Sequence, residues 1–68
     1  MTNIAVTTSQ ANVRTGPDES YSKIGWIKEG RSVVILGGTE KWSRVKVIGG
    51  DMDGKIGWIH DDLLESSD

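Results

Sequence analysis

The sequence predicts an all-β domain, and three observations lead to this. Short runs rich in Val, Ile, Thr and Trp, the residue types that strands prefer, recur along the chain. Nine glycines and one proline separate these runs, as is typical of turns between strands. No segment keeps the 3.6-residue apolar spacing of a helix over several turns.

We expect six strands, at residues 4–8, 11–14, 26–28, 31–37, 42–48 and 55–60. Residues 15–23 are too polar and irregular for a strand, and we expect a long loop there. Residues 37–41 and 49–54 are expected to be hairpin turns, because Gly supplies positive φ and Asp can bond its own backbone.

The C-terminal segment contains Leu63 and Leu64 after two acidic residues, which predicts one helical or 3₁₀ turn. The residues that follow it are polar. We therefore expect a domain over residues 1–64 and a polar tail or linker over residues 65–68.

Length and composition limit how the domain is stabilised. A chain of 68 residues makes one domain, and a domain of that size buries only about 60% of the surface of its unfolded chain. The chain has no cysteine, so neither a disulfide nor a cysteine-based zinc site can contribute. Its core must come from Val, Ile, Leu and Trp.

The charge pattern argues against nucleic acid as a partner. The formal net charge is −2, and the eight basic residues are scattered along the chain, whereas phosphate binding requires clustered Lys and Arg. No apolar run approaches the roughly 20 residues of a membrane span. No signal-peptide pattern follows Met1.

Side-chain alternation assigns the faces of the strand at 42–48. One face carries Ser43, Val45 and Val47, and the other carries Trp42, Arg44, Lys46 and Ile48. The charged residues mark the second face as the solvent face, so we expect Trp42 there. Alternation alone leaves the faces of the strand at 55–60 undecided.

Four segments together resemble the bacterial Src-homology-3 (SH3) domain. They are Ala11-Asn12-Val13-Arg14-Thr15-Gly16-Pro17, Ile24-Gly25-Trp26-Ile27, Trp42-Ser43-Arg44-Val45 and Gly57-Trp58-Ile59. The resemblance covers roughly residues 4–64. It implies a small, partly open SH3-like β-barrel of five to six antiparallel strands with a short 3₁₀ turn near the C-terminus.

The resemblance also orients the remaining strands. In that family the aliphatic residue after the Trp is buried, which turns Ile27 and Ile59 inward and Trp26 and Trp58 outward. All three tryptophans are then expected at or near the surface. The expected core is Ala11, Val13, Ile24, Ile27, Val33, Ile35, Val45, Val47, Ile59 and Leu64.

The family's groove lies between the long first loop, the second hairpin loop and the final 3₁₀ turn. The corresponding candidate ligand-binding residues are Tyr21, Asp18, Glu19, Trp42, Trp58, His60 and Leu63. His60 and Leu63 stand where eukaryotic relatives have a proline and a tyrosine, so the ridges that read polyproline are incomplete. Clustered outward aromatics beside polar loops are typical of a recognition surface.

The motif at the start of the long loop is expected to be structural. Side chains of Asn12 and Arg14 can bond loop amides and carbonyls that have no strand partner. Gly16 is expected to allow an unusual backbone conformation, and Pro17 to fix where the loop departs.

We expect no catalysis, cofactor or metal. Asp51-x-Asp53-Gly54 resembles a fragment of a calcium loop, but it lacks the flanking helices of an EF-hand, and a hairpin turn is the favoured interpretation. His60 with Asp61 or Asp62 offers half of a triad, but no Ser stands in a Gly-x-Ser-x-Gly elbow. One histidine without cysteines or well-spaced carboxylates does not make a zinc site.

The resemblance therefore implies a non-catalytic, monomeric binding module. It would target a larger exported bacterial protein, extracellular or associated with the cell wall, to peptidoglycan or a peptide ligand. An alternative remains open, in which the module is structural and packs against a neighbouring catalytic domain of the same protein.

Overall fold

The computed structural model describes residues 3–67, and over that range the protein is all-β, as predicted. Seven strands and one 3₁₀ turn are present in the described range. In chain order they are β1 (Ile4–Thr7), β2 (Ala11–Arg14), β3 (Lys23–Ile27), β4 (Ser32–Gly38), β5 (Trp42–Val47), β6 (Ile56–His60), η1 (Asp61–Leu63) and β7 (Leu64–Ser66).

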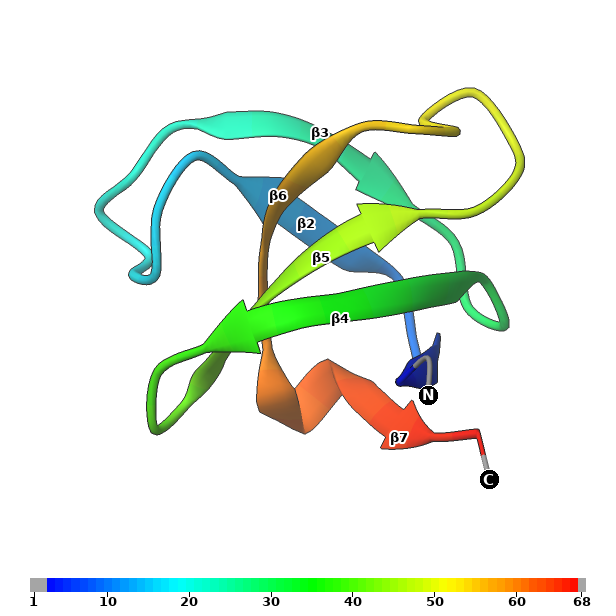
Figure 1. Cartoon of the computed structure of the whole chain (residues 1–68). Coiled ribbons are helices and arrows are strands. Elements are labelled where there is room, and N and C mark those ends of the chain that lie inside the picture. Colours follow the sequence, from blue (N-terminus) through cyan, green and yellow to red (C-terminus); the bar gives the residue numbers. More distant parts are fainter. Residues whose placement is uncertain (1–2, 68) are drawn as a thin grey trace.

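All strand pairs are antiparallel, and the strand order is β3-β2-β6-β5-β4-β1-β7. The sheet curls on itself into an open barrel, and β6 joins β2 to β5 (Figure 1). The loop between β2 and β3 and the turn between β4 and β5 project to the same side (Figure 1). The fold is thus the SH3-like barrel that the sequence predicts.

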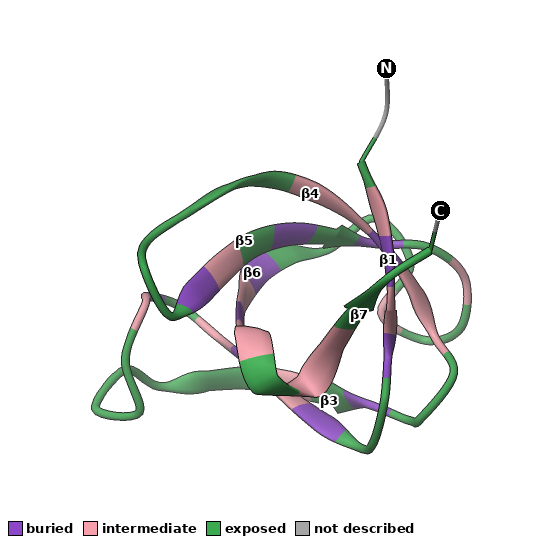
Figure 2. Ribbon diagram, turned by 90° about the horizontal axis from the view of Figure 1, so that it is seen from below, coloured by how far each residue is buried: buried purple, intermediate pink, exposed green. Residues whose placement is uncertain are grey.

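The core is small and aliphatic. Buried residues line the inside of the curled sheet (Figure 2), and they are Ala5, Ala11, Val13, Ile27, Val33, Val45, Val47 and Ile59. Seven of these eight were expected, and Ala5 is the addition. Ile35 and Leu64, also expected, are partly buried against this core.

The expected burial of Ile24 is wrong, since its side chain is 41% exposed. Val13 pairs with Gly25 and Arg14 pairs with Lys23, so a β-bulge leaves Ile24 without a cross-strand partner. Ile24 and Ile27 are three residues apart in β3, so side-chain alternation places them on opposite faces. Gly25 lies opposite Val13 on the same face as Ile27, and Ile24 turns outward.

The beginning of the polar tail is a strand. Glu65 and Ser66 pair with Val6 and Ala5 in the β1–β7 ladder. These two residues of the expected polar tail or linker thus take part in the sheet. Backbone groups of β1 supply the hydrogen bonds, and such a ladder does not require apolar side chains.

A buried hydroxyl ties β1 to the turn that follows β3. The Thr7 side chain is 2% exposed; its Oγ1 donates to the carbonyl of Lys28 at 2.7 Å and accepts from the N–H of Arg31 at 2.9 Å. Both hydrogen-bonding capacities of the hydroxyl are used, which is how a buried polar group avoids a desolvation cost.

Both expected hairpin turns are present. The β4–β5 turn is closed by a bond from the Thr39 N–H to the Trp42 carbonyl at 2.8 Å. In the β5–β6 turn, Gly49, Gly50 and Gly54 have φ of 81°, 72° and 82°, values at which a side chain would be strained. The Asp53 carboxylate accepts from the Gly49 N–H at 2.6 Å, so the Asp-x-Asp-Gly fragment stabilises a turn.

Candidate functional site

Arg14 holds the long loop in place. Its Nη1 donates to the carbonyl oxygens of Glu19 and Tyr21, each at 3.0 Å. The loop is closed at its base by the Thr15 N–H and the Ser22 carbonyl, 2.9 Å apart. The structural role expected for Arg14 is thereby confirmed, and it fixes the part of the loop that carries Tyr21.

Gly16 lies beneath the Tyr21 ring. Its φ is not positive, so the unusual conformation expected from the sequence is wrong. A Cβ on Gly16 would lie 2.5 Å from two ring carbons of Tyr21. Gly16 is therefore required for close approach, and it lets the ring pack flat on the loop while 47% of Tyr21 remains exposed.

Trp58 lies between two arginines. It is half-buried on β6, opposite Arg14 of β2 and Arg44 of β5. Gly57, the preceding residue, faces inward, where a Cβ would overlap Val13 Cγ1 and lie 2.9 Å from the Arg14 carbonyl oxygen. Because Gly57 has no side chain, β6 can approach β2 closely. Trp58 is thereby placed beside Arg14, which holds the long loop.

Trp42 is on the expected face but is not exposed. It is the cross-strand partner of His60, and the two rings meet edge to face with centroids 5.1 Å apart. Only 9% of Trp42 is accessible, so the prediction of a solvent-exposed Trp42 is wrong. The His60 ring contacts Trp42 on the face that alternation assigns to solvent.

The other predicted site residues are placed as follows. Asp18 and Glu19 are exposed on the long loop. His60 is half-buried, and its Nδ1 accepts from the Asp62 N–H at 3.1 Å. Leu63 packs against the core. The structure thus joins Trp42 with His60. Arg14 bonds the Tyr21 carbonyl and pairs with Trp58 across β2 and β6, whereas Leu63 packs against the core.

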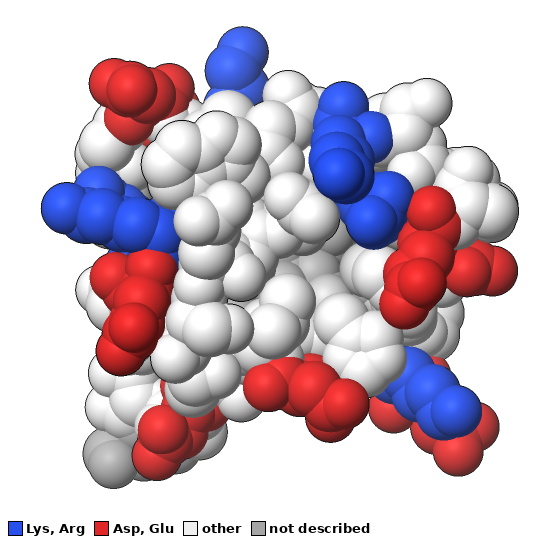
Figure 3. Space-filling model, turned by 180° about the vertical axis from the view of Figure 1, so that it is seen from behind, with Lys and Arg blue, Asp and Glu red and all other residues white. Residues whose placement is uncertain are grey.

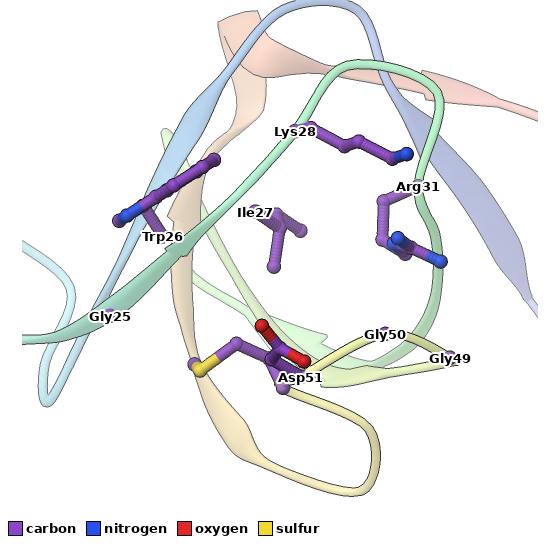
Figure 4. A pocket seen from close by; sticks show the side chains of 9 residues that line it. Gly25, Trp26, Ile27, Lys28, Arg31, Gly49, Gly50 and Asp51 are labelled. Carbon is purple, nitrogen blue, oxygen red and sulfur yellow. The ribbon is translucent and has the colours of Figure 1, made fainter.

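Sequence reasoning missed a second concave site on another part of the barrel. This pocket has a volume of about 440 Å³ and lies between β3 and the β5–β6 turn (Figure 4). Its lining is Gly25, Trp26, Ile27, Lys28, Arg31, Gly49, Gly50, Asp51 and Met52. None of the predicted site residues belongs to it. The feature of the sequence that could have indicated this pocket is the outward Trp26 followed by Lys28 and Arg31.

A smaller pocket of about 280 Å³ lies where β1, η1 and β7 meet. Asn3, Ser43, Asp61 and Ser66 are its polar lining residues. The Ser43 hydroxyl donates to the Asp61 carboxylate at 2.5 Å, so these two polar groups already satisfy each other. We assign this pocket a structural role.

Charged side chains lie around the periphery of the face in Figure 3, where both signs are interspersed and the centre is uncharged. Within residues 3–67, no three His, Cys, Asp or Glu side chains are grouped so that they could hold a metal ion. No helix in the described part of the chain is long and apolar enough to cross a membrane.

Comparison with known proteins identifies the family. Residues 9–65 match the bacterial SH3 domain, over more than half of the 68-residue chain. The comparisons with curated proteins and with solved structures gave no significant match. Domains of the SH3 type are generally non-catalytic binding modules. The matched segment runs from β2 to the start of β7, and it includes the long loop, both hairpin turns and η1. By that match and by its fold, this chain belongs to the bacterial SH3 domain family.

Proposed function

We propose that this domain holds a larger exported bacterial protein on its substrate by binding the peptide part of cell-wall peptidoglycan, or a similar peptide. The ligand would lie in a groove lined by Tyr21, Trp58 and His60, with Trp42 as its supporting wall. The observation that carries the proposal is the Arg14 side chain, which ties the Tyr21 loop beside the strand of Trp58.

The groove offers apolar contact and a weak negative rim. Flat aromatic side chains can take a glycine-rich or alanine-rich backbone, which has little bulk of its own. Wall peptides and their cross-bridges also carry free amines, and the exposed carboxylates of Asp18 and Glu19 would attract them. Such exposed pairs contribute less than about 1 kcal/mol, so we expect aromatic contacts to dominate affinity.

Sedimentation of the domain with purified peptidoglycan tests the groove. Trp58→Ala should weaken binding at least about tenfold, equivalent to ~1.4 kcal/mol, because it removes the central aromatic surface. Tyr21→Ala should weaken binding in the same direction, and Tyr21 is exposed enough that its truncation should leave the fold intact. Ile48→Ala is the control, since Ile48 is exposed and belongs neither to the groove nor to the pocket beside Trp26.

Soluble peptides separate the ligand classes. Oligoglycine and oligoalanine peptides should shift the Trp58 indole signal in an NMR titration, and proline-rich peptides should not. If Trp58→Ala and Tyr21→Ala both remain folded and both retain full binding to the wall, the groove is not the binding surface. The alternative, packing against a neighbouring catalytic domain, would then be favoured.

A further inference from the structure

The pocket beside Trp26 carries an inference that the groove does not. We propose that it is a second ligand site, which binds an acidic peptide segment: one that presents a carboxylate next to an apolar side chain. The site combines one exposed aromatic ring, two cations that form no ion pair within residues 3–67, and the edge of a strand.

Trp26 supplies an apolar wall that has no evident role in the fold. It is 57% exposed, the largest exposed fraction among the tryptophans, and its backbone position opposite Asn12 puts it on the outer face. Met52 forms part of the lining, and Gly25 lets it approach, since a Cβ on Gly25 would be 2.8 Å from the Met52 sulfur. Met52 therefore lies on the inner side of β3, and Trp26 lies at the outer edge of the pocket.

The Arg31 side chain packs against the two glycines at the start of the β5–β6 turn. A Cβ on Gly50 would lie 2.8 Å from Arg31 Nη2, and one on Gly49 would lie 3.1 Å from Nη1. The guanidinium therefore lies against backbone that carries no side chains (Figure 4). Arg31 is half-buried, and a guanidinium packed against backbone has less conformational entropy to lose on binding a carboxylate than a fully exposed one.

Lys28 and Arg31 have no acidic partner among the residues that the structure describes. Among residues 3–67, the one ion pair joins His60 and Asp62. Asp51 lines the pocket but lies outside ion-pair distance of both cations. The pocket lining therefore has two positive groups and one negative group, in a chain whose formal net charge is −2. This local excess of positive charge complements a carboxylate.

The backbone beside the pocket suits an extended peptide. β3 is the terminal strand of the sheet, so within the described residues one side of its backbone has no strand partner. Exposed strand edges accept an added strand through main-chain hydrogen bonds. The volume of about 440 Å³ lies in the range of small-ligand sites. Asp51 at the rim disfavours a polyphosphate backbone but can accept a hydrogen bond from a peptide N–H.

An NMR titration at physiological ionic strength tests the site. The probe is the peptide acetyl-Gly-Glu-Leu-Asp-Gly-amide, and the readouts are the indole signals of the three tryptophans and the backbone amides. We expect shifts at Trp26 and in residues 25–31 and 49–52, with Trp58 unchanged. The isosteric peptide acetyl-Gly-Gln-Leu-Asn-Gly-amide should bind at least tenfold more weakly, because it lacks both carboxylates.

Two variants and two controls make the test specific. Arg31→Gln and Lys28→Gln should each weaken the acidic peptide several-fold, whereas Lys46→Gln and Lys55→Gln, outside the pocket, should not. The Thr7 bonds involve the backbone of Arg31 and Lys28, so both pocket variants should keep the fold, as an unchanged pattern of core amides would verify.

Three results would overturn the proposal. These are no Trp26 shift at millimolar peptide, equal binding of the acidic and amide peptides, or affinity unaffected by both pocket variants. Inorganic phosphate is titrated as a further probe. If it shifts the same amide signals and binds with the same affinity as the peptide, the pocket is a simple anion site. Wall binding through the groove is measured separately, so either proposal can fail without the other.

Discussion

The rings of Trp42 and His60 meet edge to face, with centroids 5.1 Å apart and planes inclined by 71°. The two residues are direct cross-strand partners where β5 begins and β6 ends. His60 therefore covers a tryptophan that alternation places on the outer face. A side chain predicted to bind ligand is in consequence also part of the stabilising structure.

Truncating Trp42 should destabilise the domain rather than act on binding alone. Trp42→Ala should lower the free energy of unfolding by about 3–5 kcal/mol, because it removes a large buried ring. His60→Ala should cost about 0.5–1.5 kcal/mol from the lost aromatic contact. Chemical denaturation measures both, with the exposed Trp26→Ala as control. A Trp42→Ala domain as stable as Trp26→Ala would contradict the burial of Trp42.

Two isoleucines of β6 give a matched test of the core. Ile59 is fully buried and Ile56 is 45% exposed. Ile59→Ala should cost roughly 2–4 kcal/mol of unfolding free energy, because the cavity cannot close in so small a core. Ile56→Ala should cost well under half of that. Equal losses in a denaturation experiment would mean that the faces of β6 are wrongly assigned.

Removing the Arg14 side chain should loosen the long loop. Arg14→Ala deletes the donors to the carbonyls of Glu19 and Tyr21, so backbone amides of residues 15–22 should exchange with solvent faster. Arg44→Ala is the control, since Arg44 also lies opposite Trp58 but belongs to the other neighbouring strand. Hydrogen exchange measures the effect. Unchanged protection in Arg14→Ala, together with weakened ligand binding, would instead assign Arg14 to ligand contact.

Two glycines outside the positive-φ region should respond oppositely to alanine. Gly57→Ala places a methyl group against Val13 Cγ1 and the Arg14 carbonyl, and it should cost about 1–3 kcal/mol through overpacking. Gly37→Ala meets nothing within 4 Å and should be neutral or slightly stabilising, since alanine restricts the unfolded chain. Thermal melts compare the two, and similar melting temperatures would refute close packing of β6 on β2.

Local chemistry made much of this fold predictable. In the strand at 42–48, side chains alternate between two faces, and the charged residues on one face place Val45 and Val47 on the inner one. Glycines beside Asp predict the turn that follows. The donors of Arg14 suit a loop whose carbonyls have no strand partner, and this expectation is confirmed. Each of these inferences depends on residues close together in the chain.

The candidate site was predictable only in part. Arg14 bonds the Tyr21 carbonyl and pairs with Trp58, and the groove formed by the predicted residues stays a prediction. The pocket beside Trp26 was missed, because its walls come from β3 and from a turn more than twenty residues later in the chain. Only closure of the barrel brings Arg31 over Gly49 and Gly50.

The sequence by itself determined an all-β domain of the SH3 kind, its turns and most of its buried residues. The tertiary structure alone decided that Trp42 is covered and that Glu65 and Ser66 extend the sheet. The physical reason is that alternation and turn propensity act along the chain. Exposure and strand pairing depend on which distant segment lies across the sheet.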